Sequence, residues 1–285
     1  MALALHQERA EVESLNGNLE ATEYWVQYTL PRAASPLARA NLYKLLVLQY
    51  ALETQYDRAT EVGCEALALL GIDLSQEVRA TALARELADL RDRLGTQPVT
   101  WLLAEPRLED PTIEVALDLL SGVATASYKS DRDLWLLTVA TSVNLGLKHG
   151  QSQKLAYAYV CYGIILGSVF GEYHRGYEFG MLARKLGQRY GDRAQICVAC
   201  AVIASALIPW VRPLAEANPM FEEGQRAGST SGNLLLPDMP GSTRCDICFT
   251  RGNAWNRFRP RWRDRSPSRR EPGTSGQSMG LPPCN

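Results

Sequence analysis

The sequence lacks the motifs that usually reveal a nucleotide-binding or phosphoryl-transfer enzyme. It contains no GxxxxGK[ST] phosphate loop, no GxGxxG turn and no kinase catalytic-loop signature. The strict alternation of apolar and polar residues that predicts strands is also nearly absent. We therefore expect an all-α chain that is not an enzyme and holds no cofactor.

Histidine is scarce, and the cysteines are not arranged for metal binding. The three histidines are His6, His149 and His174. His149 ends a predicted helix, where a positive imidazole suits the helix dipole. Cys197–Cys200 and Cys245–Cys248 are isolated CxxC pairs, whereas a zinc site needs four ligands. The first pair lies in an apolar helical pattern, where thiols pack as small hydrophobic groups. We predict no metal site.

Long hydrophobic runs are missing as well. The longest run, 196–211, is interrupted by Ser205 and Pro209, and a bilayer span needs about 20 apolar residues. We interpret it as a buried packing helix and expect no membrane contact. No secretory signal is present, so the cysteines favour a reducing cytoplasm.

The net charge of −1 hides an uneven distribution along the chain. Residues 232–285 contain nine Arg, no Lys and four acidic residues, which gives this segment a net charge of +5. The remaining residues 1–231 therefore carry −6. An acidic body argues against nucleic acid as the main partner.

Helical periodicity dominates up to about residue 228. The beginnings of helices are marked by Ser35-Pro36, Asp110-Pro111 and the candidate caps Asp131 and Asp192, and glycines mark the C-terminal ends. Because the turns are short, we expect consecutive helices to pack as antiparallel hairpins, with residues 75–150 fitting this frame least well. The predicted helices are 2–16, 19–30, 36–54, 56–70, 75–94, 99–105, 111–128, 131–149, 152–170, 173–190, 193–210 and 213–227.

Two stretches of the chain, 55–63 and 172–180, are nearly the same. Tyr, Arg, Glu and Gly recur at identical offsets, followed by Ala and Leu. Small residues spaced four and then three apart share one helix face, which lets the partner helix of the hairpin approach closely. This complementarity of large and small residues is typical of tetratricopeptide repeats. The predicted repeat-packing residues are Tyr56, Ala59, Gly63, Ala66, Tyr173, Gly176, Gly180 and Ala183.

The repeat also contains the pairs Arg58–Glu61 and Arg175–Glu178. One interpretation is a ligand-binding pair on a concave surface. The other, which we favour, is an ordinary ion pair on the surface of each helix.

Residues 232–285 differ in composition from the rest of the chain. They are rich in Arg, Pro, Gly and Ser, which predicts a disordered tail without a core. Arginine without lysine is typical of out-of-frame GC-rich DNA, so we hypothesise a frameshift near residues 229–236, which resequencing decides. The other interpretation is a nucleic-acid-binding arm, with Trp255, Phe258 and Trp262 stacking on bases.

Several short sequence motifs, and their order along the chain, resemble those of a known family. They lie at residues 8–11, 15–18, 66–74, 173–180 and 209–224. They resemble the tetratricopeptide-like helical region of large bacterial signalling proteins, over about residues 1–231. Those proteins combine a serine/threonine kinase, an AAA-type ATPase, a GAF domain and a histidine kinase. The resemblance implies that this chain is a fragment of such a protein. No catalytic residue is carried over, because no matching position lies in those domains.

These observations predict a tetratricopeptide-like superhelix at 1–231, followed by the tail. The repeat predicts a non-catalytic scaffold that binds a protein or a peptide. The resemblance implies that this scaffold acts in signal transduction and contacts neighbouring kinase and ATPase domains. The alternatives are a free-standing peptide-binding adaptor and an ATP-binding protein kinase like the parent proteins. Tyr157, Tyr159 and Tyr162 either line a binding groove or pack in the core.

Overall fold

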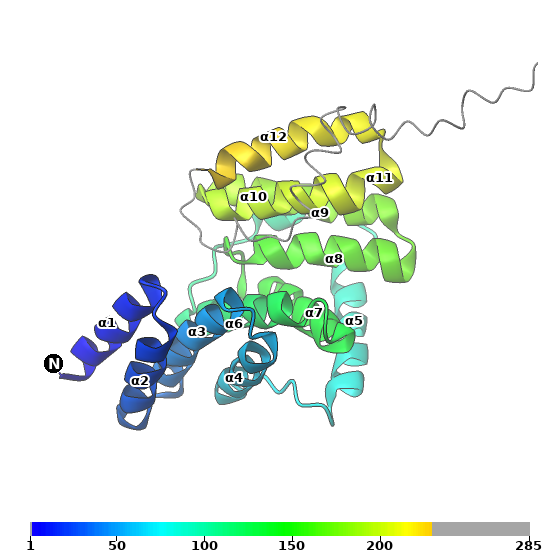
Figure 1. Ribbon diagram of the computed structural model, residues 1–285. Coiled ribbons are helices and arrows are strands. Elements are labelled where there is room, and N and C mark those ends of the chain that lie inside the picture. Colours follow the sequence, from blue (N-terminus) through cyan, green and yellow to red (C-terminus); the bar gives the residue numbers. More distant parts are fainter. Residues whose placement is uncertain (1, 230–285) are drawn as a thin grey trace, which may run out of the picture.

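The computed structural model describes residues 2–229, and all named elements in this range are helical (Figure 1). The all-α prediction is therefore confirmed. The predicted tail 232–285, its frameshift and Cys245–Cys248 lie outside the described residues. The α-helices are α1 (Ala2–Leu15), α2 (Leu19–Thr29), α3 (Pro36–Leu52), α4 (Tyr56–Leu69), α5 (Arg79–Leu94), α6 (Pro111–Ser127), α7 (Arg132–His149), α8 (Leu155–Phe170), α9 (Tyr173–Tyr190), α10 (Arg193–Val202), α11 (Ile208–Val211) and α12 (Ala217–Gly228).

Capping side chains set the beginning of several helices, as predicted. Ser35, Asp110, Asp131 and Asp192 each accept a hydrogen bond from a backbone N–H in the first turn of α3, α6, α7 and α10. Such bonds satisfy donors that the helix itself leaves without a partner. The predicted boundaries of these helices accordingly agree with the structure to within two residues at their first turn.

Most neighbouring helices form hairpins, and the hairpins follow one another in space. α1 packs on α2, α3 on α4, α6 on α7 and α8 on α9, while α4 also packs on α6, and α7 on α8 (Figure 1). One buried cluster joins α7, α8, α9 and α10, and two smaller clusters fill the hairpins of the N-terminal half. The core is thus distributed along the array.

α5 does not follow the expected hairpin order. It packs mainly on α7 instead of α4, so the chain resumes the array at α6 (Figure 1). Its buried residues Leu90 and Leu94 belong to the same cluster as Val139 and Val143 of α7. This departure falls within residues 75–150, which we expected to fit the hairpin frame least well, and the connection 70–78 lets α5 reach a later helix.

The predicted helix 193–210 is interrupted by a π-helical turn, η3 (Ile203–Leu207). Pro209 explains it, since proline has no N–H to donate and its ring clashes with the carbonyl four residues earlier. Within the described residues, Arg193–Val211 is long and apolar enough to cross a membrane by length and composition alone. This is weak evidence, because core helices pass the same test, and here Ile203 and Leu207 are buried against the array.

Candidate functional site

Six of the eight predicted repeat-packing residues are buried, and the two tyrosines are not. The small residues of both copies lie inside the array, whereas Tyr56 and Tyr173 are 42% and 37% exposed at the first turns of α4 and α9. The buried residues are Ala59, Gly63, Ala66, Gly176, Gly180 and Ala183.

The small residues contact two neighbours rather than the hairpin partner alone. Gly176 of α9 lies against Gly163 of α8, where an added Cβ on Gly163 would lie 2.5 Å from the Gly176 carbonyl oxygen. One turn later, Gly180 faces the next hairpin, and a Cβ there would lie 2.5 Å from Leu207 Cδ1. Gly63 likewise lies against Val123 of α6. Each seam therefore fixes the hairpin and its successor.

The arginines of the repeat do not form the predicted ion pairs within their own helices. Arg58 Nη2 instead lies 2.9 Å from Glu23 Oε1 of α2 and donates to the Tyr50 hydroxyl at 2.8 Å. Tyr50 in turn donates to Glu23 at 2.6 Å. Burial, followed by the hydrogen bond to Glu23, raises the pKa of Tyr50 to about 12. The interaction ties α2, α3 and α4 together.

The second copy uses its arginine differently. Arg175 donates to the backbone carbonyl oxygens of Leu94 at 3.3 Å and Gly95 at 2.5 Å, at the end of α5. These hydrogen bonds satisfy backbone carbonyl groups that have no partner within the helix, because they lie at its C-terminus. Both arginines therefore connect elements, and the prediction of surface pairs with Glu61 and Glu178 was wrong.

The tyrosines of α8 pack mostly in the core. Tyr159 is fully buried and donates to Gln151 Oε1 at 2.9 Å, and Tyr162 contacts the ring of Phe179 edge-on. Burial raises the pKa of Tyr162 to about 12. Tyr157 is half-buried. The groove interpretation fails for Tyr159 and Tyr162.

An open cleft lies beside the first turns of α6 and α8. It encloses about 490 Å³. The segment that precedes α6 and the segment that precedes α8 are joined by a parallel β-bridge between Arg107 and Gln151. The backbone N–H of Gln151 donates to the carbonyl oxygen of Pro106 at 2.7 Å. Apolar side chains of Leu108, Pro111 and Val115 share the lining with polar ones, which are Arg107, Glu109, Glu114, Ser152, Gln153, Lys154 and Tyr190.

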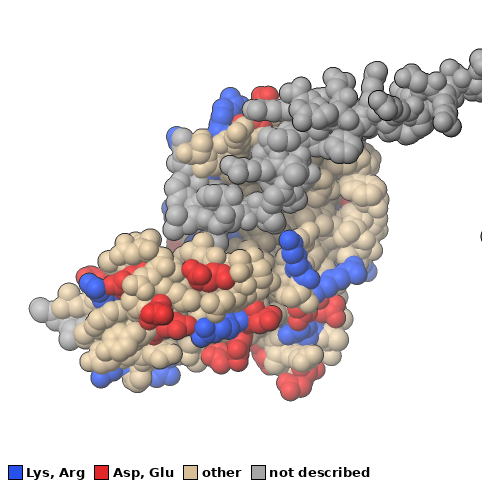
Figure 2. Space-filling model, viewed as in Figure 1, with Lys and Arg blue, Asp and Glu red and all other residues tan. Residues whose placement is uncertain are grey.

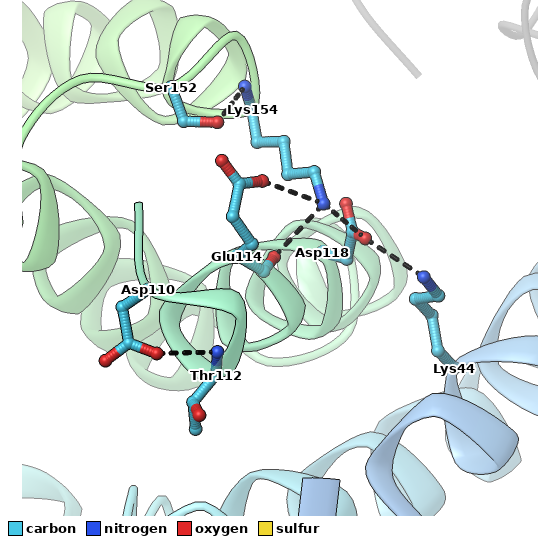
Figure 3. Close-up of polar contacts among 7 residues, drawn as sticks. All are labelled: Lys44, Asp110, Thr112, Glu114, Asp118, Ser152 and Lys154. Atoms are coloured by element: carbon cyan, nitrogen blue, oxygen red, sulfur yellow. Dashed lines mark hydrogen bonds and ion pairs between the residues drawn. The ribbon is translucent and has the colours of Figure 1, made fainter. Parts of the chain in front are cut away.

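Lys154 crosses from α8 to α6 at this cleft (Figure 3). Its Nζ lies 2.7 Å from Asp118 Oδ2 and 3.0 Å from Glu114 Oε2, and Lys44 of α3 lies 3.2 Å from the same Asp118 oxygen. Burial alone would lower the pKa of Lys154, but the hydrogen bonds and charges of Asp118 and Glu114 outweigh it, so the pKa is raised. Lys154 therefore stays protonated, and its ion pairs with two carboxylates connect the beginning of α8 to α6.

The cleft is lined by charged groups of both signs. Binding of a phosphate chain needs free cations or unsatisfied helix N-termini. Here Lys154 is paired with two carboxylates, and the N–H of Thr112 donates to Asp110. Arg107 lines the same cleft and has no carboxylate partner among the described residues, while Glu109 and Glu114 would repel phosphate. Concave sites that combine apolar side chains with a few polar groups commonly bind small molecules.

No metal-binding cluster of three or more His, Cys, Asp or Glu occurs within residues 2–229. Cys197 lies at the contact of α10 with α12, where an added Cβ on Gly228 would meet its sulfur at 2.7 Å. Burial raises the pKa of Cys200 to about 12, so its thiol is a packing group. His6 stacks on Trp25.

Comparison with known proteins yields one distant relative. The hybrid signal transduction histidine kinase G of Dictyostelium discoideum is 20% identical over an alignment of 211 residues, and the match covers 68% of this chain and 6% of that protein. No family model matches the sequence, and no solved structure matches it. The chain is thus similar to a small part of a much longer signalling protein.

The cleft residues carried only a partial signal in the sequence. Asp110-Pro111 correctly predicted the first turn of α6, and Glu114 and Asp118 are four residues apart on that helix. Lys154 had no signal, since its partners are 36 or more residues away. The bridge between 107 and 151 depends on the path of two loops, which local patterns do not describe.

Proposed function

We propose that this chain is a non-catalytic helical scaffold that mediates protein–protein or interdomain contacts in cytoplasmic signal transduction. The observation that carries the proposal is the array of helical hairpins, in a chain whose sequence is distantly similar to a segment of a hybrid histidine kinase. Arrays of this kind contact only their neighbours along the chain and leave a long surface free for partners.

We further propose that the array is tetratricopeptide-like. Support comes from the repeated small-residue seams, in which Gly176 packs on α8 and Gly180 on the following hairpin. The large-and-small complementarity at a fixed spacing is the physical basis of that repeat class. The partners under this proposal are kinase or ATPase domains of a signalling protein, or a separate protein or peptide.

Site-specific photo-crosslinking in cells tests the scaffold proposal. A photoreactive residue is placed at exposed positions over the cleft and on α2, one position at a time, in the full chain. We expect each active position to crosslink to a signalling protein or domain, and the crosslink to disappear when a folded competitor of the same chain is added in excess. Crosslinking that is uniform over all positions and not reduced by the competitor would contradict the proposal.

The kinase alternative has its own test. Titration calorimetry of the purified chain with Mg-ATP is expected to give no heat of binding, and incubation with labelled ATP no transfer of phosphate. Saturable nucleotide binding that is lost on substitution of a cleft residue would replace the scaffold by an ATP-dependent function. A free-standing adaptor would instead crosslink only to short peptide segments.

A further inference from the structure

One face of α2 carries a line of exposed side chains. Glu20, Tyr24 and Tyr28 are four residues apart and so share a face of the helix. Tyr24 is 59% exposed and Tyr28 is 38% exposed. Their rings are nearly parallel, with centroids 6.3 Å apart. We call these three residues the α2 strip.

The two tyrosine rings of the α2 strip pack against two further aromatic rings, those of His6 and Trp25. His6 of α1 stacks on Trp25 with centroids 5.4 Å apart and meets the edge of Tyr28 at 5.1 Å. Trp25 also meets the ring of Tyr24 edge-on at 5.3 Å. The two tyrosine rings are thus fixed before any partner arrives, which lowers the entropy lost on binding.

Arginine is already the preferred neighbour of tyrosine in this part of the molecule. The guanidinium of Arg32 lies 4.1 Å from the centroid of the Tyr28 ring. That of Arg58 lies 4.2 Å from the Tyr50 ring while it pairs with Glu23. A planar guanidinium stacks on an aromatic face and binds a carboxylate at its edge, which an ammonium group does less well.

Tyr24 and Glu20 also place an aromatic face beside a carboxylate, but no cation from the described residues is bound there. Within the described residues, no arginine or lysine pairs with Glu20 or stacks on Tyr24. The surrounding segment 2–29 contains five acidic residues and one basic residue, so it carries an excess negative charge of 4. A basic group would therefore be attracted to this position and find both an aromatic face and a carboxylate.

We propose that the α2 strip binds an extended, arginine-containing segment of a partner protein. One guanidinium stacks on the Tyr24 ring and pairs with the Glu20 carboxylate, in the arrangement that Arg58 has with Tyr50 and Glu23. This inference rests on the proposed scaffold function and names the chemistry of its partner.

The probe is a labelled peptide of about nine residues, with three arginines separated by serine or glycine. Fluorescence anisotropy measures its binding to the full 285-residue chain and to a variant in which the arginines of 232–285 are replaced by glutamine. Binding to either form supports the proposal, and tighter binding to the variant shows that the chain's own arginines compete. A lysine version of the peptide is expected to bind at least about fivefold more weakly.

Substitutions assign the binding to the strip. Tyr24→Ala and Glu20→Gln should each weaken binding at least about fivefold, whereas Tyr24→Phe, which keeps the ring, should bind like the wild type. Tyr128→Ala removes a tyrosine that is 53% exposed elsewhere and serves as the matched control. Circular dichroism verifies that all variants remain folded.

Two results would overturn the inference. One is the absence of saturable peptide binding to both forms of the chain. The other is binding that Tyr24→Ala and Tyr128→Ala change equally, which would indicate attraction by net charge alone. In either case, crosslinks to a partner at other positions would leave the scaffold function intact, so the two failures are distinguishable.

Discussion

At the scale of single residues, the Gly163–Gly176 contact brings the backbones of α8 and α9 directly together. A methyl group on Gly163 would overlap the backbone oxygen of Gly176, which cannot turn aside as a side chain can. We expect Gly163→Ala to lower the free energy of unfolding by about 1–3 kcal/mol. Denaturant unfolding measures it. Ala68→Ser, at an exposed position of α4, is the control and should change stability by less than about 0.5 kcal/mol.

Lys154 differs from Lys44 although both bind Asp118. The Lys154 side chain is 23% exposed and contacts two carboxylates, while the Lys44 side chain is 37% exposed and contacts one. We expect Lys154→Met to destabilise the protein by about 1 kcal/mol and Lys44→Met by less than half of that. Thermal unfolding at neutral pH compares the two variants. Equal effects would mean that Asp118 alone matters.

The ionisation of Tyr50 gives a prediction on pH. Its folded-state pKa is raised from 10.0 to about 12. A pKa raised by folding means that the neutral hydroxyl stabilises the folded state fully below pH 10, and that this contribution is lost as the pH rises toward 12. The titration of tyrosine absorbance should lose a component near pH 12 in Tyr50→Phe. If the substitution instead removed a component near pH 10, the effect of burial and of the hydrogen bond to Glu23 on the pKa would be contradicted.

At the scale of helices, α5 should be the least protected of the long inner helices. Only three of its sixteen residues are buried, whereas twelve of the eighteen residues of α7 are. Amide hydrogens exchange through local opening, which is easier where few contacts are lost. Hydrogen exchange followed by mass spectrometry should show faster exchange in peptides from 79–94 than from 132–149. Equal protection would mean that α5 opens only together with α7.

Most helices could be predicted from the sequence because their signals are local. Ser35-Pro36 and Asp110-Pro111 combine a capping side chain with a proline in the first turn, and both begin a helix in the structure. The partners of Arg58 and the place of α5 could not be predicted in the same way. They depend on which helices meet across the array, and spacing along one helix does not encode this.

The same limit applies to the candidate site and to the small-residue seams. Periodicity indicates that Gly63 and Gly180 lie on the same face as Ala59 and Gly176. It does not indicate that this face divides between two neighbours, because a seam one helix wide and a seam shared by two helices have the same spacing. Only the contacts with Val123 and Leu207 distinguish them.

At the scale of the whole molecule, charge and core are both divided along the array. Residues 1–128 contain 19 acidic and 10 basic residues, while residues 129–231 contain 8 acidic and 11 basic ones. Acidic side chains accordingly gather over the part of the face that the N-terminal helices form in Figure 2. The largest buried cluster belongs mainly to the C-terminal half. The halves thus differ in both respects.

This division predicts that unfolding is not a single cooperative transition. In a stacked array, stability is close to a sum over neighbouring units, so that one end can unfold before the other. We expect a variant that keeps only Trp25 to report an earlier denaturant midpoint than one that keeps only Trp135, because Trp25 belongs to one of the smaller clusters. Coincident midpoints would indicate a single cooperative unit.

The shared seams have a consequence for the dimensions of the molecule. Gly163 and Gly176 set how closely the backbones of α8 and α9 approach, so one additional carbon atom there would push the two helices apart and move every later helix together with α9. A small rotation at this contact displaces the more distant helices more than the near ones. A single glycine at such a contact therefore influences the separation between the two ends of the array.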